Sequence, residues 1–142
     1  MDVDRAHQCI RELCRHVLLV EDSILIALDA EVLVTDLGAE RVSIAASVLE
    51  ALRSLENAPP TLAILDVKLE GETCFPIADK LQEKQIPYAF ATGYSDKATF
   101  PDRHKLAPCM TKPYNEQALR RVIEELIGGA DQCGIQRLQQ TG

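Results

Sequence analysis

Residues that can bind a metal or carry a phosphoryl group follow four short apolar runs of the chain. Glu21 and Asp22 follow Val17–Val20, Asp66 follows Leu62–Leu65, Thr92 follows Tyr88–Ala91, and Lys112 lies just beyond Cys109 and Met110. If these runs are neighbouring parallel strands, their carboxyl ends share one edge of a sheet and the polar side chains converge there. Such a set can bind a divalent cation and carry a phosphoryl group on Asp66.

The carboxylates divide into two roles. Consecutive acids on a loop, Glu21 and Asp22, can supply oxygen ligands to Mg²⁺, although Asp22 alone could equally be a helix N-cap. Asp66 ends a buried run, so its carboxylate is expected at the sheet edge, where it would be the nucleophile that forms an acyl phosphate. A nucleotide-binding role for Asp66 is excluded because the sequence has no GxxxxGK[ST] phosphate loop.

Thr92 and Lys112 are candidate phosphate contacts. The hydroxyl of Thr92 could hydrogen-bond one phosphoryl oxygen, and the ammonium of Lys112 could pair with another. Taken singly, each has an ordinary alternative, because a threonine often ends a strand and a surface lysine is usually solvated. The sequence Lys112-Pro113 favours the functional interpretation, since a cis X-Pro bond in a tight turn would fix the direction of the lysine.

Composition indicates one water-soluble domain. The 142 residues are 46% apolar and 26% charged, and no apolar stretch approaches the roughly 20 residues that span a bilayer. The first 15 residues lack the layout of a secretion signal, so we expect a cytoplasmic protein without membrane contact. The net charge of -7 argues against direct binding of nucleic acid. Five scattered cysteines without metal-site spacing are expected to be reduced thiols.

Alternating patterns predict an α/β fold. Strands are expected at residues 16–20, 41–45, 62–66, 87–91 and 107–111. A helix is expected after the first strand, where apolar residues recur at helical spacing: Leu25, Leu28, Val32 and Leu33. A second is expected over 47–57, with an inward face of Val48, Leu49, Leu52 and Leu55. Further helices are expected from about Thr73, and from the N-cap Asn115 to about residue 127. Between the last two strands, Pro101 and sparse apolar positions predict only one short helix or turn. The result is a doubly wound, five-stranded parallel sheet with five helices, the fourth short or irregular.

The two ends of the chain are expected to be peripheral. We assign residues 1–15 to an N-terminal extension that adds at most a short helix, residues 16–128 to the domain, and residues 129–142 to a flexible tail.

Four motifs carry a family resemblance: LLVEDS at Leu18–Ser23, LAILDVKLEGE at Leu62–Glu72, ATG at Ala91–Gly93 and TKPY at Thr111–Tyr114. With them the chain resembles the receiver domain of two-component response regulators, which implies a flavodoxin-like fold. The resemblance implies that Glu21 and Asp22 hold Mg²⁺ with the backbone carbonyl of Lys68, and that Asp66 accepts phosphate from the phosphohistidine of a kinase or phosphotransfer protein. Thr92 and Lys112 would contact the phosphate, and the Lys112-Pro113 bond would be cis.

The chain departs from the family at its aromatic switch. Most receivers carry Tyr or Phe three positions before the lysine, and this chain has Cys109 there. Residues 87–94 instead resemble the PFxFATGxY pattern of the FATGUY subfamily, whose members are typically stand-alone regulators. Tyr94 could take over the aromatic role, or it could be a half-buried loop ring.

The weak fourth helix is a second departure. In the family this helix, the fifth strand and the last helix dock kinases, other partners or a second copy in a homodimer. We hypothesise that Ser95–Lys105 is flexible without phosphate and becomes ordered with it.

The leading functional hypothesis is a single-domain response regulator that catalyses its own phosphotransfer and autodephosphorylation rather than acting as a conventional enzyme. Its output would be binding to a protein that the sequence does not identify. The alternatives are a phosphorylation-independent adaptor and a receiver fragment of a hybrid histidine kinase. A metal-dependent phosphatase ranks lower, because it would need an acid at position 68, where the chain has lysine.

Overall fold

The computed structural model describes residues 3–93 and 100–129. Five parallel strands form one sheet in the order β2-β1-β3-β6-β7. They are β1 (His16–Val20), β2 (Arg41–Ala45), β3 (Leu62–Asp66), β6 (Tyr88–Thr92) and β7 (Cys109–Thr111). The order reverses between β1 and β3, so the sheet is doubly wound as predicted.

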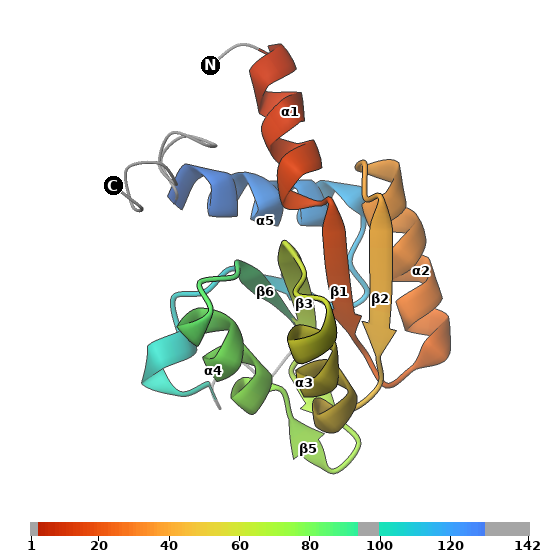
Figure 1. Ribbon diagram of the computed structural model, residues 1–142, viewed down its shortest axis with the longest axis vertical. Helices are drawn as coiled ribbons and strands as arrows, with labels where there is room; N and C mark the ends of the chain where they lie inside the picture. The colour runs from red at the N-terminus through yellow and green to blue at the C-terminus, as the bar shows by residue number, and fades with distance from the viewer. Residues whose placement is uncertain (1–2, 94–99, 130–142) are drawn as a thin grey trace.

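Five α-helices surround this sheet: α1 (Val3–Leu13), α2 (Ile24–Asp36), α3 (Val48–Asn57), α4 (Phe75–Glu83) and α5 (Glu116–Gly129). Residues of α1, α2 and α5 belong to the apolar cluster on one face of the sheet, and those of α3 and α4 to the cluster on the other. Figure 1 shows α3 and α4 in front of the strands. A small hairpin, β4 (Lys68–Leu69) and β5 (Glu72–Thr73), follows β3. No helix in the described part of the chain is both long and apolar enough to cross a membrane.

The registers align the carboxyl ends of the strands. Val20 of β1 lies opposite Leu65 of β3, and Asp66 lies opposite Ala91 of β6. Every residue of β1 and β3 is buried, as expected for strands covered on both faces. The residues that end these strands therefore meet at one edge of the sheet.

Five helices were predicted, and the described residues contain five α-helices. α1 lies in the segment where at most a short helix was expected, and between β6 and β7 the described residues 100–108 form a 3₁₀ turn at Asp102–His104. Pro101 precedes this turn, and a turn of this kind is the other outcome that the sparse apolar pattern allowed.

The N-terminal segment is less peripheral than expected. Ile10 and Leu13 of α1, and Cys14 just after it, are buried members of the core cluster. The hydroxyl of Thr61 donates to the carbonyl of Leu13, 2.6 Å away, and accepts from the backbone N–H of His16, 3.0 Å away. In Figure 1, α1 lies beyond the amino ends of the strands and beside α5. It therefore extends the core on the side opposite the carboxyl edge.

The buried face of α2 was not predicted, and the predicted inner face of α3 was wrong at one residue. Leu25, Leu28 and Val32 of α2 are exposed, and its buried residues are Ala27, Ala30 and Val34. Because α2 is apolar nearly all round, two stripes fit the helical period, and the one with alanines lies against the sheet. In α3, Leu49 was expected to face inward but is exposed; Leu55 is buried, and Val48 and Leu52 pack against the core as expected.

Several boundaries were close to the prediction. β6 begins at Tyr88 and β7 at Cys109, each directly after a proline, which has no N–H to donate to a ladder. Helix α4 begins at Phe75, with Pro76 in its first turn. The backbone N–H of Ala118 donates to Asn115 Oδ1 at 2.9 Å, as expected for the N-cap of α5.

Candidate functional site

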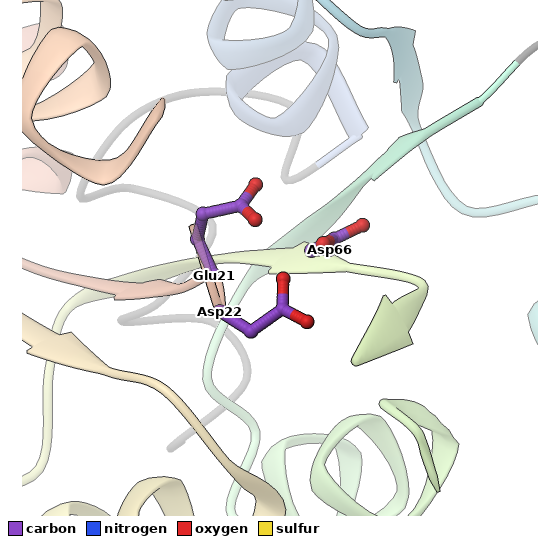
Figure 2. Close-up of side chains that lie close together, drawn as sticks. All are labelled: Glu21, Asp22 and Asp66. Atoms are coloured by element: carbon purple, nitrogen blue, oxygen red, sulfur yellow. The ribbon is translucent and has the colours of Figure 1, made fainter. Parts of the chain in front are cut away.

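Three carboxylates gather where β1 and β3 end. Glu21 and Asp22 lie on the loop between β1 and α2, and Asp66 is the last residue of β3. One oxygen from each lies within 4.8 Å of the others, and Figure 2 shows the three side chains around one small space. Glu21 and Asp66 are buried, whereas Asp22 is exposed. Hard oxygen ligands, closely spaced and open to solvent on one side, fit Mg²⁺.

Lys112, the residue directly after β7, completes the cluster. Its Nζ lies 3.1 Å from Asp66 Oδ2 and 3.1 Å from Glu21 Oε1. Its backbone N–H donates to the carbonyl of Thr92 at 2.9 Å, and its peptide bond to Pro113 is cis. The ammonium thus contacts the expected nucleophile directly. The sequence did not indicate the second contact, to Glu21.

Burial and neighbouring charges together set the pKa values of Asp66 and Lys112. Burial, aided by the negative charge of Glu21, raises the pKa of Asp66 to about 7, although hydrogen bonding to Lys112 works in the other direction. Burial also disfavours the charge on Lys112, but its hydrogen bonds to Asp66 and Glu21 outweigh that cost and raise its pKa. The cluster therefore holds more negative charge than one ammonium can balance, which favours binding of a further cation.

Glu21 and Asp22 play different structural parts. The N-cap of α2 is Ser23, not Asp22. The backbone N–H of Ser23 donates to Glu21 Oε2 at 3.1 Å. Glu21 is thus held by Ser23 and Lys112. The helix-cap alternative for Asp22 fails, and its exposed carboxylate stays available to a ligand.

Thr92 lies next to this cluster at the end of β6. Its side chain is buried, and its Oγ1 donates to the carbonyl of Gly93 at 3.0 Å. Ala91, one residue earlier, is opposite Asp66 in the sheet. The structure thus brings together five of the predicted site residues: Glu21, Asp22, Asp66, Thr92 and Lys112.

The other predicted residues stand apart from this group or outside it. Lys68 begins β4, two residues beyond Asp66, and is exposed; the metal role of its carbonyl stays a prediction. Cys109 is half-buried on β7, beside the α3 and α4 cluster. Tyr94 lies outside the described residues. So do residues 95–99 of the hypothesised mobile segment, whereas Phe100 and His104 in its second half are buried.

Sequence reasoning missed Tyr114 near the site. With Glu21 and Asp66 it lines a small cavity on the α2 side of the cluster. Burial, and then the charges of Glu21 and Asp66, raise the pKa of its phenol. The only sequence signal for this position was its place at the end of the TKPY motif.

The thiol of Cys74 interacts electrostatically with Asp66. Burial and then the charge of Asp66 raise the pKa of its thiol to about 12, so it stays protonated and is no nucleophile.

A doubly wound sheet with an acidic cluster and a lysine at its carboxyl edge is the arrangement of the receiver class of signalling proteins. Residues 17–124 match the family described as the response regulator receiver domain, and the chain belongs to that family.

Known relatives agree with this assignment. The sensory transduction protein LytT of Enterococcus faecalis is 34% identical over 113 residues, which make up 78% of this chain and 47% of LytT. The phyllosphere-induced regulator PhyR of Methylorubrum extorquens is 28% identical over 129 residues, or 88% of this chain and 48% of PhyR. The chain thus spans about half the length of these two relatives.

A similar solved structure is that of SdrG from Sphingomonas melonis Fr1. It superposes with a TM-score of 0.72 at 33% identity, covering 81% of this chain and 98% of the SdrG chain.

Proposed function

We propose that this receiver domain accepts a phosphoryl group on Asp66 from a phosphohistidine in a Mg²⁺-dependent reaction. The observation that carries the proposal is the contact of Lys112 with Asp66, 3.1 Å apart, beside the Glu21 and Asp22 carboxylates. A buried carboxylate with a cation on one oxygen and an acidic metal-binding set next to it matches the needs of phosphoryl transfer.

In the transfer one bond forms and one bond breaks. An oxygen of Asp66 attacks phosphorus, an O–P bond forms, and the P–N bond to the donor histidine breaks with its electron pair returning to the imidazole. Lys112 pairs with a phosphoryl oxygen, and Thr92 turns its hydroxyl from the carbonyl of Gly93 to another. Glu21, Asp22, Asp66 and the carbonyl of Lys68 would hold Mg²⁺, which when bound supplies positive charge that reduces repulsion between the carboxylate and the phosphoryl group.

Hydrolysis returns the protein to its starting state. Water attacks phosphorus of the acyl phosphate, phosphate leaves, and the carboxylate of Asp66 is regenerated. The domain is thus both acceptor and catalyst of its own dephosphorylation, and it signals while the phosphoryl group is present.

An exposed apolar helix face beside the site supports a protein donor. Ile24, Leu25, Leu28 and Val32 are each at least 45% exposed on α2, which begins two residues after Asp22. Exposed apolar side chains grouped in this way mark interaction surfaces. We infer that a histidine kinase or phosphotransfer protein docks here and delivers its phosphohistidine to Asp66.

We further propose that the chain acts as a single-domain regulator of the FATGUY type in the cytoplasm, with residues 16–128 as the receiver. The sequence Pro87–Tyr94 and the match to 98% of the SdrG chain support this assignment. Its downstream partner would be a protein.

Intact-mass spectrometry after incubation with acetyl phosphate and Mg²⁺ tests the proposal. We expect a gain of one phosphoryl group in the native chain, no gain in Asp66→Asn, and no gain when a chelator removes Mg²⁺. If neither acetyl phosphate nor a phosphorylated histidine kinase adds mass to the native chain, the proposal is wrong and the adaptor alternative is favoured.

A further inference from the structure

A buried histidine holds the segment before β7 against α4 and β6. His104, at the end of the 3₁₀ turn Asp102–His104, has no exposed surface. Its ring stacks on Phe75 of α4, with centroids 5.8 Å apart at 11°, and meets Phe90 of β6 edge-on, at 5.7 Å and 75°. The imidazole therefore sits between a helix and the strand that leads to Thr92.

Both ring nitrogens of His104 have partners. Nε2 lies 2.8 Å from Asp79 Oδ1 of α4, and Nδ1 lies 3.0 Å from the hydroxyl of Tyr88 of β6. Arg103 also donates two hydrogen bonds to the Asp79 carboxylate, from Nε to Oδ1 at 2.6 Å and from Nη2 to Oδ2 at 2.8 Å. The bonds from Arg103, and then from His104, hold the pKa of Asp79 at about 2, so the carboxylate stays charged. We call Asp79, His104, Arg103 and Tyr88 the latch.

An aromatic anchor works beside the latch. Phe100 is 4% exposed and makes edge contacts with Phe90 at 4.9 Å and with Phe75 at 5.3 Å. A three-residue 3₁₀ turn has little stability of its own. The placement of residues 100–107 therefore depends on these contacts with α4 and β6.

The latch is linked to Thr92 through β6. Phe90 lies two residues before Thr92, so the two side chains project from the same face of the sheet. In this structure the Thr92 hydroxyl donates to Gly93, and only six residues separate Gly93 from Phe100 in sequence. A movement of Thr92 toward Asp66 would pull on β6, the strand that the latch holds through Tyr88 and Phe90.

We propose that the latch is an autoinhibitory contact, which favours the unphosphorylated arrangement and opens when a phosphoryl group on Asp66 draws Thr92 toward it. This inference rests on the proposed function. In this inference His104 takes the switching role that most receivers give to an aromatic residue at the position of Cys109. A ligand shifts a two-state equilibrium only by its preference for one state, so weakening the latch must tighten phosphoryl binding.

Two mild variants weaken the latch without touching the site. Tyr88→Phe removes only the hydroxyl at His104 Nδ1, and Arg103→Ala removes the outer ion pair to Asp79. Lys105→Ala is the matched control, because its 2.9 Å ion pair with Asp102 lies within the turn segment and does not reach α4. Each would be titrated in Mg²⁺ with beryllium trifluoride, a tetrahedral mimic of the phosphoryl group.

We expect the dissociation constant to fall about threefold to tenfold in Tyr88→Phe and about twofold in Arg103→Ala, with no change in Lys105→Ala. Saturating beryllium trifluoride should also speed hydrogen exchange at the His104 amide, which donates to the Pro101 carbonyl in this structure.

The outcomes separate the two proposals. If the native chain binds beryllium trifluoride but folded latch variants bind it equally well or more weakly, the latch is a structural contact and the inference is wrong. A lower melting temperature with an unchanged dissociation constant leads to the same conclusion. If the native chain binds no beryllium trifluoride, the proposed function is wrong, and the latch inference that rests on it is wrong as well.

Discussion

At the scale of single residues, the site depends on the balance at Asp66. Burial and Glu21 disfavour its charged form, and Lys112 favours it. In the proposed reaction Asp66 must be ionised to act as the nucleophile, and a metal cation bound beside it would favour that ionised form.

This balance predicts how stability depends on pH in the metal-free protein. The pKa of Asp66 is about 7 in the folded state against 3.8 for the ordinary group, so between these values the folded chain keeps a proton that the unfolded chain has lost. Stability is therefore expected to fall as pH rises through this window and to level off above about 7, by about 2 kcal/mol between pH 5 and pH 8. Urea unfolding in chelator across this range measures it.

Asp66→Asn is the control for that measurement, since it keeps the shape of the side chain and removes the titration. The decline should be absent or much smaller in this variant. Parallel pH profiles for the two proteins would show that other groups cause the change.

At the scale of secondary-structure elements, α2 is unusual because it is apolar on two faces. Ala27, Ala30 and Val34 cover the sheet, while Leu25 and Leu28 face solvent. Ordinary helix packing leaves the outer face polar. The retained apolar face supports its proposed role in docking a phosphodonor.

The double variant Leu25→Ser with Leu28→Ser tests that role. We expect phosphotransfer from a phosphorylated histidine kinase to slow by about tenfold or more, because two exposed apolar contacts are lost. Phosphorylation by acetyl phosphate, which needs no docking surface, should be unchanged. Leu49→Ser on α3 is the matched control, because the exposure of Leu49 lies between those of Leu25 and Leu28. Equal slowing in the control, or slowing with acetyl phosphate as well, would contradict a docking role for α2.

The sequence predicted the strands better than the helix faces. Leu62–Leu65 is apolar throughout and ends in a single acid, a pattern with one plausible structure, and Asp66 lies where that pattern predicts. In α2 the pattern predicted the helix but not its buried face, since helical period alone does not say which of two apolar stripes is buried. The Asn115 cap could be predicted because a cap is a local interaction.

Contacts between distant elements could not be predicted. Lys112 and Glu21 are far apart in sequence, and nothing in either motif indicates that their side chains meet. His104 lies in a stretch with weak periodicity, so its burial against Phe75 and Phe90 follows only from the three-dimensional packing. The resemblance to receivers supplied the roles at the carboxyl edge, but it gave no indication of the latch.

At the scale of the whole molecule, the proposed metal site would link metal binding to folding. The three acids come from two segments that meet only when β1 and β3 pair, so the unfolded chain offers no equivalent site. A ligand that binds only the folded state stabilises it by mass action. The net charge of -7 adds a general attraction for cations, which a test must separate from binding at the cluster.

Mg²⁺ should therefore raise the free energy of unfolding of the whole domain, by about 2.7 kcal/mol at a concentration one hundred times its dissociation constant. Thermal or urea unfolding at pH 8, against NaCl of equal ionic strength, measures the gain. Asp22→Asn should abolish most of it, whereas Glu56→Gln, the same charge change at another exposed acid, should keep it. The gain should shrink toward pH 5, because the proton held by Asp66 competes with the metal. A gain of equal size in Asp22→Asn, or one that NaCl reproduces, would mean that Mg²⁺ acts through general screening and not at the carboxyl edge of the sheet.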